Sequence, residues 1–239
     1  MKKLLLSGLL LSLLSLPAIA QLTYGPEAGF NISDYNLTDP GLLQPTSLWV
    51  PGFHIGGIAD YAVSKHVSVQ PGAFYALNGI KLDYTFFLIG SVTSSAHINT
   101  IRIPINVQYK FGDAAGNRFF AGIGPFIGIN LSGSAKVNAQ GGSLFPGKNI
   151  DSSGTLKVGS DSSDYVRRFD FGAGVNAGYE WLSGLFVRAY YQRGFVNLAP
   201  VAGGEGVIKS VNFGVSVGYL FNHKPKKKVV PVKKPVFKR

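Results

Sequence analysis

The most informative segment of this chain reads Val207-Ile208-Lys209-Ser210-Val211-Asn212-Phe213-Gly214-Val215-Ser216-Val217-Gly218-Tyr219-Leu220-Phe221. From Val211 onward apolar residues occupy the odd positions, while Ser, Asn and Gly occupy the even positions as far as Gly218. Alternation with a period of two predicts a β-strand with two different faces. The segment exceeds the five or six residues usual for a strand of a soluble protein. A large apolar face, a small or polar face and an aromatic end are typical of a strand in a membrane β-barrel.

Residues 1–20 have the pattern of a secretory signal peptide. Met1-Lys2-Lys3 is basic, residues 4–16 are apolar apart from Ser and Gly, and Pro17-Ala18-Ile19-Ala20 ends in a small residue. The apolar run is shorter than the roughly 20 residues that a spanning helix needs, so a retained membrane anchor is the less favoured alternative. We expect cleavage after Ala20. No later segment is a long uncharged apolar run, so a membrane would be crossed by strands.

The net charge of +11 belongs mostly to the ends of the chain. Of the 23 basic residues, Lys2 and Lys3 leave with the signal peptide and a further group follows Phe221, whereas all 12 acidic residues lie between Gln21 and Phe221. The body is therefore nearly neutral and lacks the basic face that a nucleic-acid-binding domain needs. The absence of cysteine excludes disulfides, thiolate metal sites and cysteine nucleophiles.

The same alternation predicts eight strands in the body of the chain. We expect them at residues 22–32, 53–63, 67–78, 98–111, 118–131, 165–181, 185–195 and 207–221. Long loops are expected at 33–51, 79–96, 132–164 and 196–206, and short turns at 64–66, 112–117 and 182–184. Residues 82–87 are an alternative continuation of a strand beyond the membrane. Because proline cannot donate to a ladder, we place a bulge at Pro71.

Long and short connections alternate along the whole chain, as in outer-membrane barrels with short periplasmic turns and long outer loops. An even number of strands puts both ends of the barrel in the periplasm. The outward aromatic residues at the short-turn ends predict one interfacial girdle: Tyr61, Tyr109, Phe111, Phe119, Tyr179, Trp181, Tyr219 and Phe221. A soluble sandwich has no reason to gather aromatic residues at one rim. We therefore predict an all-β fold, an eight-stranded antiparallel up-and-down transmembrane barrel over residues 21–221.

Several segments carry a resemblance to a known family. They are Ala28-Gly29-Phe30-Asn31, Ile101-Arg102-Ile103-Pro104-Ile105, Phe120-Ala121-Gly122-Ile123-Gly124-Pro125 and Phe213 to Phe221. Through them residues 21–221 resemble the porin family of outer-membrane β-barrel proteins common in Bacteroidetes, and the architecture is similar to the small OmpA and OmpX barrels. The resemblance implies a Gram-negative cell envelope, contact with outer-membrane lipid, and a terminal signal read by the barrel assembly machinery. That signal would be carried by Phe213, Gly214, Val217, Tyr219 and Phe221. The label "porin" does not establish transport.

Charged residues occupy many inward positions of the expected strands. They are Glu27, Asp60, Arg102, Lys110, Arg118, Arg168, Asp170, Glu180 and Arg188. Eight strands leave a lumen that side chains can fill, and a charge there must be paired or hydrated. We therefore expect a salt-bridge network that plugs the barrel. A narrow channel for small solutes or ions is the alternative, favoured by inward glycines that thin the filling, such as Gly122, Gly124, Gly128 and Gly214.

The sequence offers little material for catalysis. His66-Val67-Ser68 combines a histidine and a serine, but it lies at an expected periplasmic turn, whereas a lipid-modifying outer-membrane hydrolase would need its residues at the outer leaflet. His54 and His97 have no second ligand at the spacing of a metal site, and the glycines follow strand parity rather than a phosphate-binding loop. We expect no enzyme activity, no cofactor and no metal.

Residues 222–239 form a tail of Lys, Pro and Val that we expect to be extended and flexible. Its charges include Lys224, Lys226, Lys227, Lys228, Lys233 and Lys234. In the periplasm such a tail would contact peptidoglycan, anionic headgroups or a periplasmic protein, or would only solvate the chain end. The sequence thus favours a structural or surface-interaction scaffold with a plugged polar lumen. The alternatives are a narrow channel and, less favoured, a lipid-modifying enzyme.

Overall fold

The computed structural model describes residues 22–38, 46–112, 116–159, 166–199 and 207–221. The expected signal peptide at 1–20 and the expected tail at 222–239, with its lysines, lie outside these residues. Within the described ranges, no helix is long and apolar enough to cross a membrane.

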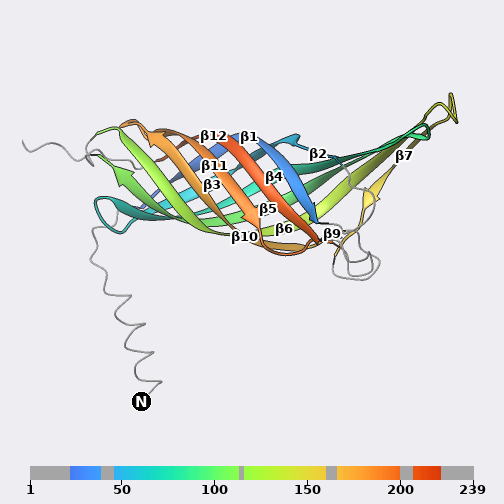
Figure 1. Cartoon of the computed structure of the whole chain (residues 1–239). Coiled ribbons are helices and arrows are strands. Elements are labelled where there is room, and N and C mark those ends of the chain that lie inside the picture. The colour runs from blue at the N-terminus through green and yellow to red at the C-terminus, as the bar shows by residue number, and fades with distance from the viewer. Residues whose placement is uncertain (1–21, 39–45, 113–115, 160–165, 200–206, 222–239) are drawn as a thin grey trace, which may run out of the picture.

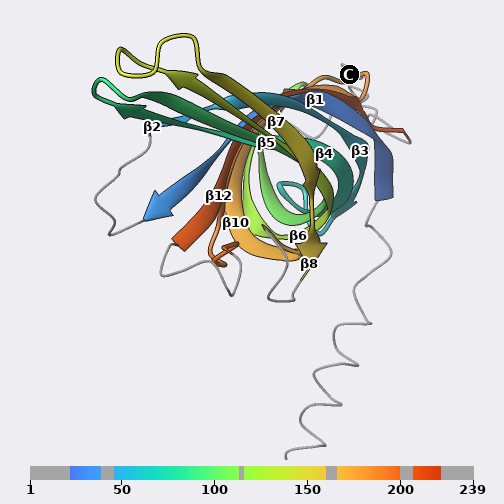
Figure 2. The same cartoon turned by 90° about the vertical axis from the view of Figure 1, so that its right-hand side faces the viewer.

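Long antiparallel strands pair around a complete ring, which Figure 2 shows nearly end-on. The ring contains β1 (Leu22–Thr38), β3 (Val50–Ala62), β4 (Val67–Phe86), β5 (Gly90–Phe111), β6 (Arg118–Gly141), β10 (Phe169–Glu180), β11 (Leu185–Gly194) and β12 (Val207–Tyr219). Each strand pairs with the next of these along the chain, and β12 pairs with β1. The predicted eight-stranded up-and-down barrel is confirmed.

The ring is apolar outside and polar inside. Phe30 is 75% exposed on the outer face of β1, whereas its near neighbour Glu27 is only 2% exposed on the inner face. The same alternation runs along β12, where Phe213, Val215 and Val217 are exposed and the residues between them are buried. Large apolar side chains on an outer surface are stable in hydrocarbon rather than in water. The burial pattern is that of a barrel with lipid around it.

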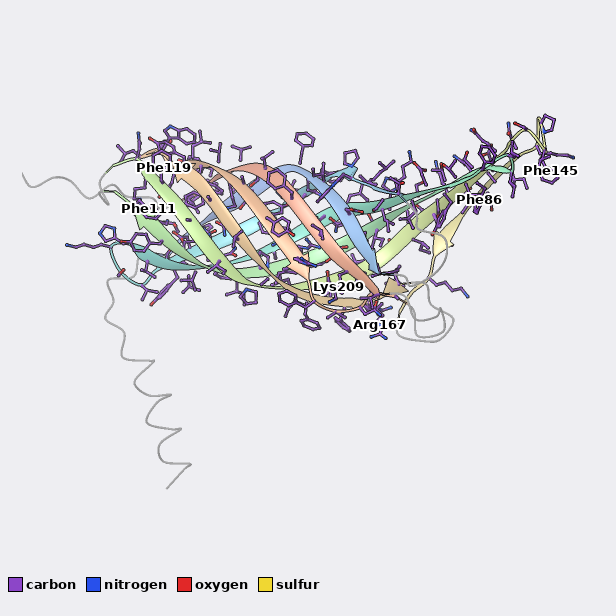
Figure 3. All side chains as sticks on the ribbon, viewed as in Figure 1. Phe86, Phe111, Phe119, Phe145, Arg167 and Lys209 are labelled. Carbon is purple, nitrogen blue, oxygen red and sulfur yellow. The ribbon has the colours of Figure 1, made fainter. Side chains whose placement is uncertain are left out.

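One end of the barrel carries the short turns, and we call it the short-turn end. The turns follow β3, β5 and β10, and positive φ angles at Gly112 (107°) and Gly184 (91°) close two of them. Aromatic rings gather at this end: Tyr109 lies 4.8 Å from Phe111, and Phe119 lies 4.7 Å from Tyr179, between ring centroids. Figure 3 shows Phe111 and Phe119 at this end. These contacts agree with the predicted girdle.

At the other end, β4, β5 and β6 continue past the ring as a projecting sheet (Figure 1). We call this part the sheet extension and define it as residues 79–97 and 132–156. Pairing continues to Phe86↔Gly90 between β4 and β5 and to Gly90↔Gly141 between β5 and β6. Two more strands join its edges: β2 (Thr46–Leu48) pairs with β4, and β7 (Asn149–Leu156) pairs with β6. A separate parallel pair, β8 (Val158–Gly159) and β9 (Val166–Arg167), follows β7.

Three expected loops are therefore largely strand. Residues 33–38, most of 79–96 and much of 132–156 belong to β1, β4, β5, β6 and β7, so the loop predictions there are wrong. The alternative, that residues 82–87 continue a strand, is confirmed for 82–86. Residues 79–86 do alternate, with Ile80, Leu82, Tyr84 and Phe86 at the even positions, whereas 90–97 and 149–156 are mostly polar on both faces and lack the alternation that identifies the strands of the ring.

The bulge predicted at Pro71 is also wrong. The pairs Ile58↔Gly72 and Tyr61↔Val69 keep one register on either side of it, and Pro71 itself is opposite Ile105. Because proline has no backbone N–H, Pro71 cannot donate one hydrogen bond of the ladder, but the strand does not need the extra residue of a bulge to accommodate it. A register shift occurs instead between Asn99 and Thr100, where β5 leaves the ring and enters the sheet extension.

Candidate functional site

The first candidate site is the barrel lumen, where several of the predicted charges meet. Near the short-turn end, the Lys110 ammonium lies 2.5 Å from a carboxylate oxygen of Asp60 and 2.9 Å from one of Glu180. The second oxygen of Glu180 accepts from the Arg118 guanidinium at 2.5 Å. All four side chains are nearly inaccessible to solvent. A buried charge is tolerated only when it is paired and hydrogen-bonded, and this chain of ion pairs meets that condition.

Gln70 connects these ion pairs to a second group of charges. Arg188 lies 3.4 Å from Glu27 and also donates to the side-chain oxygen of Gln70. The amide nitrogen of Gln70 donates to Asp60 at 3.5 Å. Ser216 donates to the remaining oxygen of Glu27 at 2.5 Å. The network therefore crosses the lumen from β1 and β11 to β3, β5 and β10.

Two predicted members, Arg102 and Asp170, lie apart from these ion pairs. Arg102 donates to Gln192 at 2.9 Å and lies 4.7 Å above the ring of Phe126. Asp170 accepts from Ser210 at 2.6 Å. In the described part of the chain neither forms a salt bridge. Both are buried and inward as predicted, but neutral groups and an aromatic face bind them.

Arg168 is the one predicted lumen charge that the structure places outside the lumen. It lies between β9 and β10, where its side chain is exposed and donates to the carbonyl of Val158 at 3.4 Å. The prediction assumed an unbroken strand over 165–181, but β10 begins only at Phe169. Strand parity therefore does not apply to Arg168.

A series of hydrogen-bonded asparagine and threonine side chains, not identified from the sequence, crosses the lumen in the half away from the short-turn end. Asn212 donates to Asn78 at 2.6 Å, Asn78 donates to Thr100 at 3.3 Å, and Thr100 donates to Asn130 at 2.9 Å. Asn31 also donates to Asn78, at 3.3 Å. The members come from β12, β4, β5, β6 and β1. The only sequence signal for these residues was their position on the inward face of alternating strands, and an uncharged side chain at such a position does not by itself indicate a hydrogen-bonded chain.

Aromatic rings occupy the space that the inward glycines leave. Each ring lies directly opposite a glycine of the paired strand: Phe74–Gly56, Phe120–Gly178, Phe126–Gly172, Phe186–Gly218 and Tyr190–Gly214. A Cβ at Gly218 would come within 2.3 Å of the Phe186 ring, and one at Gly178 within 2.4 Å of the Phe120 ring. The channel alternative assumed that inward glycines leave the lumen partly empty. At these positions the space beside each glycine is instead occupied by an aromatic ring of the paired strand.

Buried apolar clusters lie in both halves of the lumen. In the half nearer to the short-turn end, which contains the ion pairs of Lys110, one cluster consists of Ile58, Phe74, Phe120, Phe186 and Leu220. At the opposite mouth, Tyr35, Ile98 and Leu198 form a second cluster with partly buried residues of β4, β7, β9 and β12. A cavity bordered by His54, Arg102, Tyr190 and Glu27, with Phe74, Ala76 and Val175 also in its wall, measures about 40 Å³. That volume holds only about three water molecules.

The second candidate site is the tip of the sheet extension. The β4–β5 turn carries Phe87, Leu88 and Ile89, and the β6–β7 turn carries Leu144 and Phe145; all five side chains are exposed. We call these five residues the apolar tip. The two turns are hydrogen-bonded to each other, from Gly142 N to Ile89 O at 2.7 Å and from Leu144 N to Leu88 O at 3.0 Å. Both turns lie in segments that were predicted as loops, and this patch was not predicted.

The predicted assembly segment lies where the alternation placed it. Phe213, Val217, Tyr219 and Phe221 are exposed on the outer face, and Gly214 faces inward against Tyr190. β12 ends at Tyr219, and Phe221 forms one further bridge to Tyr24. The segment thus closes the barrel against β1.

The histidines considered for catalysis are separate in the structure. His54 is buried beside Tyr190, whose hydroxyl lies 3.2 Å from His54 Nδ1. His66 lies at a short turn and stacks on Tyr109. His97 lies in the sheet extension, opposite Gly79. Over the described ranges, no three His, Cys, Asp or Glu residues form a group that could bind a metal ion.

The chain is similar to known outer-membrane proteins. A family model described as "Outer membrane protein beta-barrel domain" matches residues 17–199. OprG from Pseudomonas aeruginosa is 13% identical, with a TM-score of 0.46 over 84% of this chain and 97% of that chain. Ail, the attachment invasion locus protein of Yersinia pestis, is 11% identical, with a TM-score of 0.37 over 83% and 98%. Neisserial surface protein A is 11% identical, with a TM-score of 0.39 over 84% and 97%. A comparison with curated proteins gives no match.

Proposed function

Because the chain belongs to the outer membrane protein β-barrel domain family, and so to the bacterial outer membrane, we propose that it is a closed scaffold that presents the sheet extension at the cell surface. In this proposal the short-turn end faces the periplasm and the extension faces outward, as is usual for such barrels. Secretion by cleavage after Ala20 is part of the same proposal.

The filled lumen carries the proposal. Phe120 and Phe186 lie in the same half as the Asp60–Lys110–Glu180–Arg118 ion pairs, and Leu198 is buried at the opposite mouth. Moving a hydrated ion through these layers would break buried ion pairs and separate packed rings, both of which cost free energy. A rigid, filled barrel suits the display of a long sheet.

A narrow channel is the second candidate, and the cavity between the charged side chains of Glu27 and Arg102 favours it. That cavity would become part of a water-filled path through the barrel if both apolar clusters moved aside. Among the described residues, the His54 ring contacts the Tyr190 hydroxyl and the His66 ring the Lys110 carbonyl rather than a serine, so the lipid-modifying enzyme has no support, and we propose no catalytic activity and no cofactor. Contact of the Lys/Pro tail with peptidoglycan or a periplasmic protein remains a prediction.

Single-channel recording on the refolded mature chain in planar bilayers tests the proposal. Folding is verified first by the change in gel mobility on heating. We expect no stepwise conductance from the folded wild type. The triple variant Phe120→Ala, Phe186→Ala, Leu198→Ala should conduct, because it opens the apolar clusters in both halves of the lumen. Its matched control, Phe119→Ala with Phe171→Ala and Val175→Ala on the outer face, should stay silent. Stable conductance from the wild type would contradict the scaffold proposal and support the channel.

A further inference from the structure

The apolar tip gathers five exposed large apolar side chains outside the lipid-facing wall of the barrel. Phe87 is 88% exposed and Leu144 is 62% exposed. Exposed apolar groups of this kind usually mark a site of interaction with a protein or a membrane. Figure 3 shows Phe86 and Phe145 at the far end of the extension, remote from Phe111 and Phe119 in the girdle. The membrane that surrounds the barrel therefore does not account for the tip.

The backbone of the two turns holds these side chains outward. Leu88 has a φ of 66°, a left-handed conformation that side chains other than glycine adopt rarely. Phe145 N bonds to Gly142 O at 2.9 Å, and Gly141 N bonds to Lys148 O at 2.7 Å, which closes the second turn. Strained residues of this kind tend to lie at functional sites. The hydrogen bonds between the turns make the tip one preformed patch.

The charge nearest to the tip in the sequence is positive. Residues 84–91 carry no charge, and residues 139–148 carry only Lys148. Farther along the extension, lysines outnumber aspartates: Lys81 and Lys136 stand with Lys148 against Asp83 and Asp151. Lysines near a membrane surface are attracted to anionic headgroups. The tip thus combines apolar side chains with an adjoining cation and no adjoining acid.

The shape of the tip suits a lipid surface better than a protein surface. Its side chains are exposed at the ends of two hairpins, and Figure 3 shows Phe145 at one of these ends. A partner protein would need a complementary pocket, whereas a bilayer interface accepts Phe, Leu and Ile without one. Phe at the boundary between headgroups and acyl chains with Lys beside the phosphates is a usual arrangement at membrane surfaces.

We propose that the apolar tip inserts into an anionic phospholipid bilayer that faces the cell surface, such as the membrane of another cell or vesicle. Phe87, Leu88, Ile89, Leu144 and Phe145 would enter the acyl boundary, and Lys148 would contact lipid phosphates. The inference rests on the proposed function, because the extension must face outward to meet a second membrane.

The test uses the full mature chain embedded in nanodiscs and mixed with vesicles of phosphatidylcholine containing phosphatidylglycerol. We expect the nanodiscs to float with these vesicles on a density gradient. The triple variant Phe87→Ser, Leu144→Ser, Phe145→Ser should bind at least about tenfold more weakly, because burial of even one large apolar side chain is worth roughly that factor. Val137→Ser, which changes an exposed apolar residue in the middle of the extension, should bind like the wild type.

A second readout uses the absence of cysteine in the chain. An environment-sensitive dye on Phe87→Cys should shift its emission to shorter wavelength with anionic vesicles, whereas the dye on Ser153→Cys in β7 should not. Wild-type nanodiscs that fail to float, or a triple variant that floats equally well, would overturn the inference. Equal binding to pure phosphatidylcholine would overturn the part assigned to Lys148.

Labelling of intact cells separates this inference from the proposed function. If an impermeant maleimide labels Ser153→Cys on cells but the vesicles do not bind, the scaffold proposal stands and the lipid inference fails. If the maleimide does not label it, the outward orientation itself fails, and the inference fails with it.

Discussion

The barrel wall and the sheet extension share strands β4, β5 and β6, yet the two faces of these strands differ in polarity in the wall and are much more alike in the extension. Along β5, residues 105–111 alternate between exposed apolar and buried polar side chains, whereas residues 90–97 are mostly Ser, Thr and other small or polar residues on both faces. The change occurs within one continuous strand. Hydrocarbon outside and a packed lumen inside require the first pattern, and water on both sides allows the second.

The two regions also differ in what stabilises them. In the barrel, buried ion pairs and rings packed against glycines hold the strands from within. The extension relies mainly on its hydrogen-bonded ladder and on the contact between its two turns. Substitutions of one chemical type should therefore have large effects in the barrel and small effects in the extension.

Removal of a lumen cation should give the largest contrast. Lys110→Ala leaves the Asp60 carboxylate buried without its cation and takes one of two cations from Glu180, so we expect a loss of about 3–5 kcal/mol in the free energy of unfolding. Lys136→Ala, at an exposed position of the extension, should change it by less than about 0.5 kcal/mol. Urea unfolding in lipid vesicles measures both. Equal losses would contradict the assignment of barrel stability to the lumen network.

The cost in stability of a charged residue should show which outer surface faces lipid and which faces water. Val175 on β10 and Val137 on β6 are both exposed apolar residues. Val175→Arg puts a cation against hydrocarbon and should cost about 2–4 kcal/mol, less if the site lies away from the bilayer midplane. Val137→Arg lies in water and should be nearly neutral. If both variants unfold at the wild-type urea concentration, the wall around Val175 does not face lipid.

A smaller contrast distinguishes the lumen from its rim. Arg118→Ala removes a guanidinium bonded to Glu180 and should cost about 1–2 kcal/mol, because Lys110 still pairs with that carboxylate. Arg168→Ala removes an exposed side chain that bonds only weakly to a backbone carbonyl, and its effect should stay within about 0.5 kcal/mol. Matched urea titrations decide the order; a larger loss at Arg168 would return that residue to the network.

The sequence was most informative where lipid and lumen impose alternation. The ring strands, the girdle around Phe111 and Phe119, and the inward positions of Glu27 and Lys110 were all predictable, because each depends on strand parity. The extension was not, because residues such as 90–97 have no buried face and so no periodic signal. Its strands are specified by pairing, which a single sequence does not reveal.

The same limit applies inside the lumen. Parity showed that Arg102 and Asp170 point inward, but their partners, Gln192 and Ser210, come from distant strands. Arg168 was misplaced by an error in the start of one strand. The apolar tip was missed because both turns lie in segments predicted as loops, and a single sequence does not show that Phe87 and Leu144 come together across two hairpins.

The pairing of rings with glycines has a consequence for how the barrel is put together. A slip of one residue between β11 and β12 would turn every side chain to the wrong face, but a slip of two would keep the faces correct. After such a slip, Phe186 would stand opposite Ser216 or Leu220 instead of Gly218, and Tyr190 would lose Gly214. Each ring would then meet a side chain where it now meets none. Only one register places each ring opposite a glycine, so the glycines select that register when neighbouring strands pair. Hydrophobic patterning alone would not distinguish it from a register shifted by two residues.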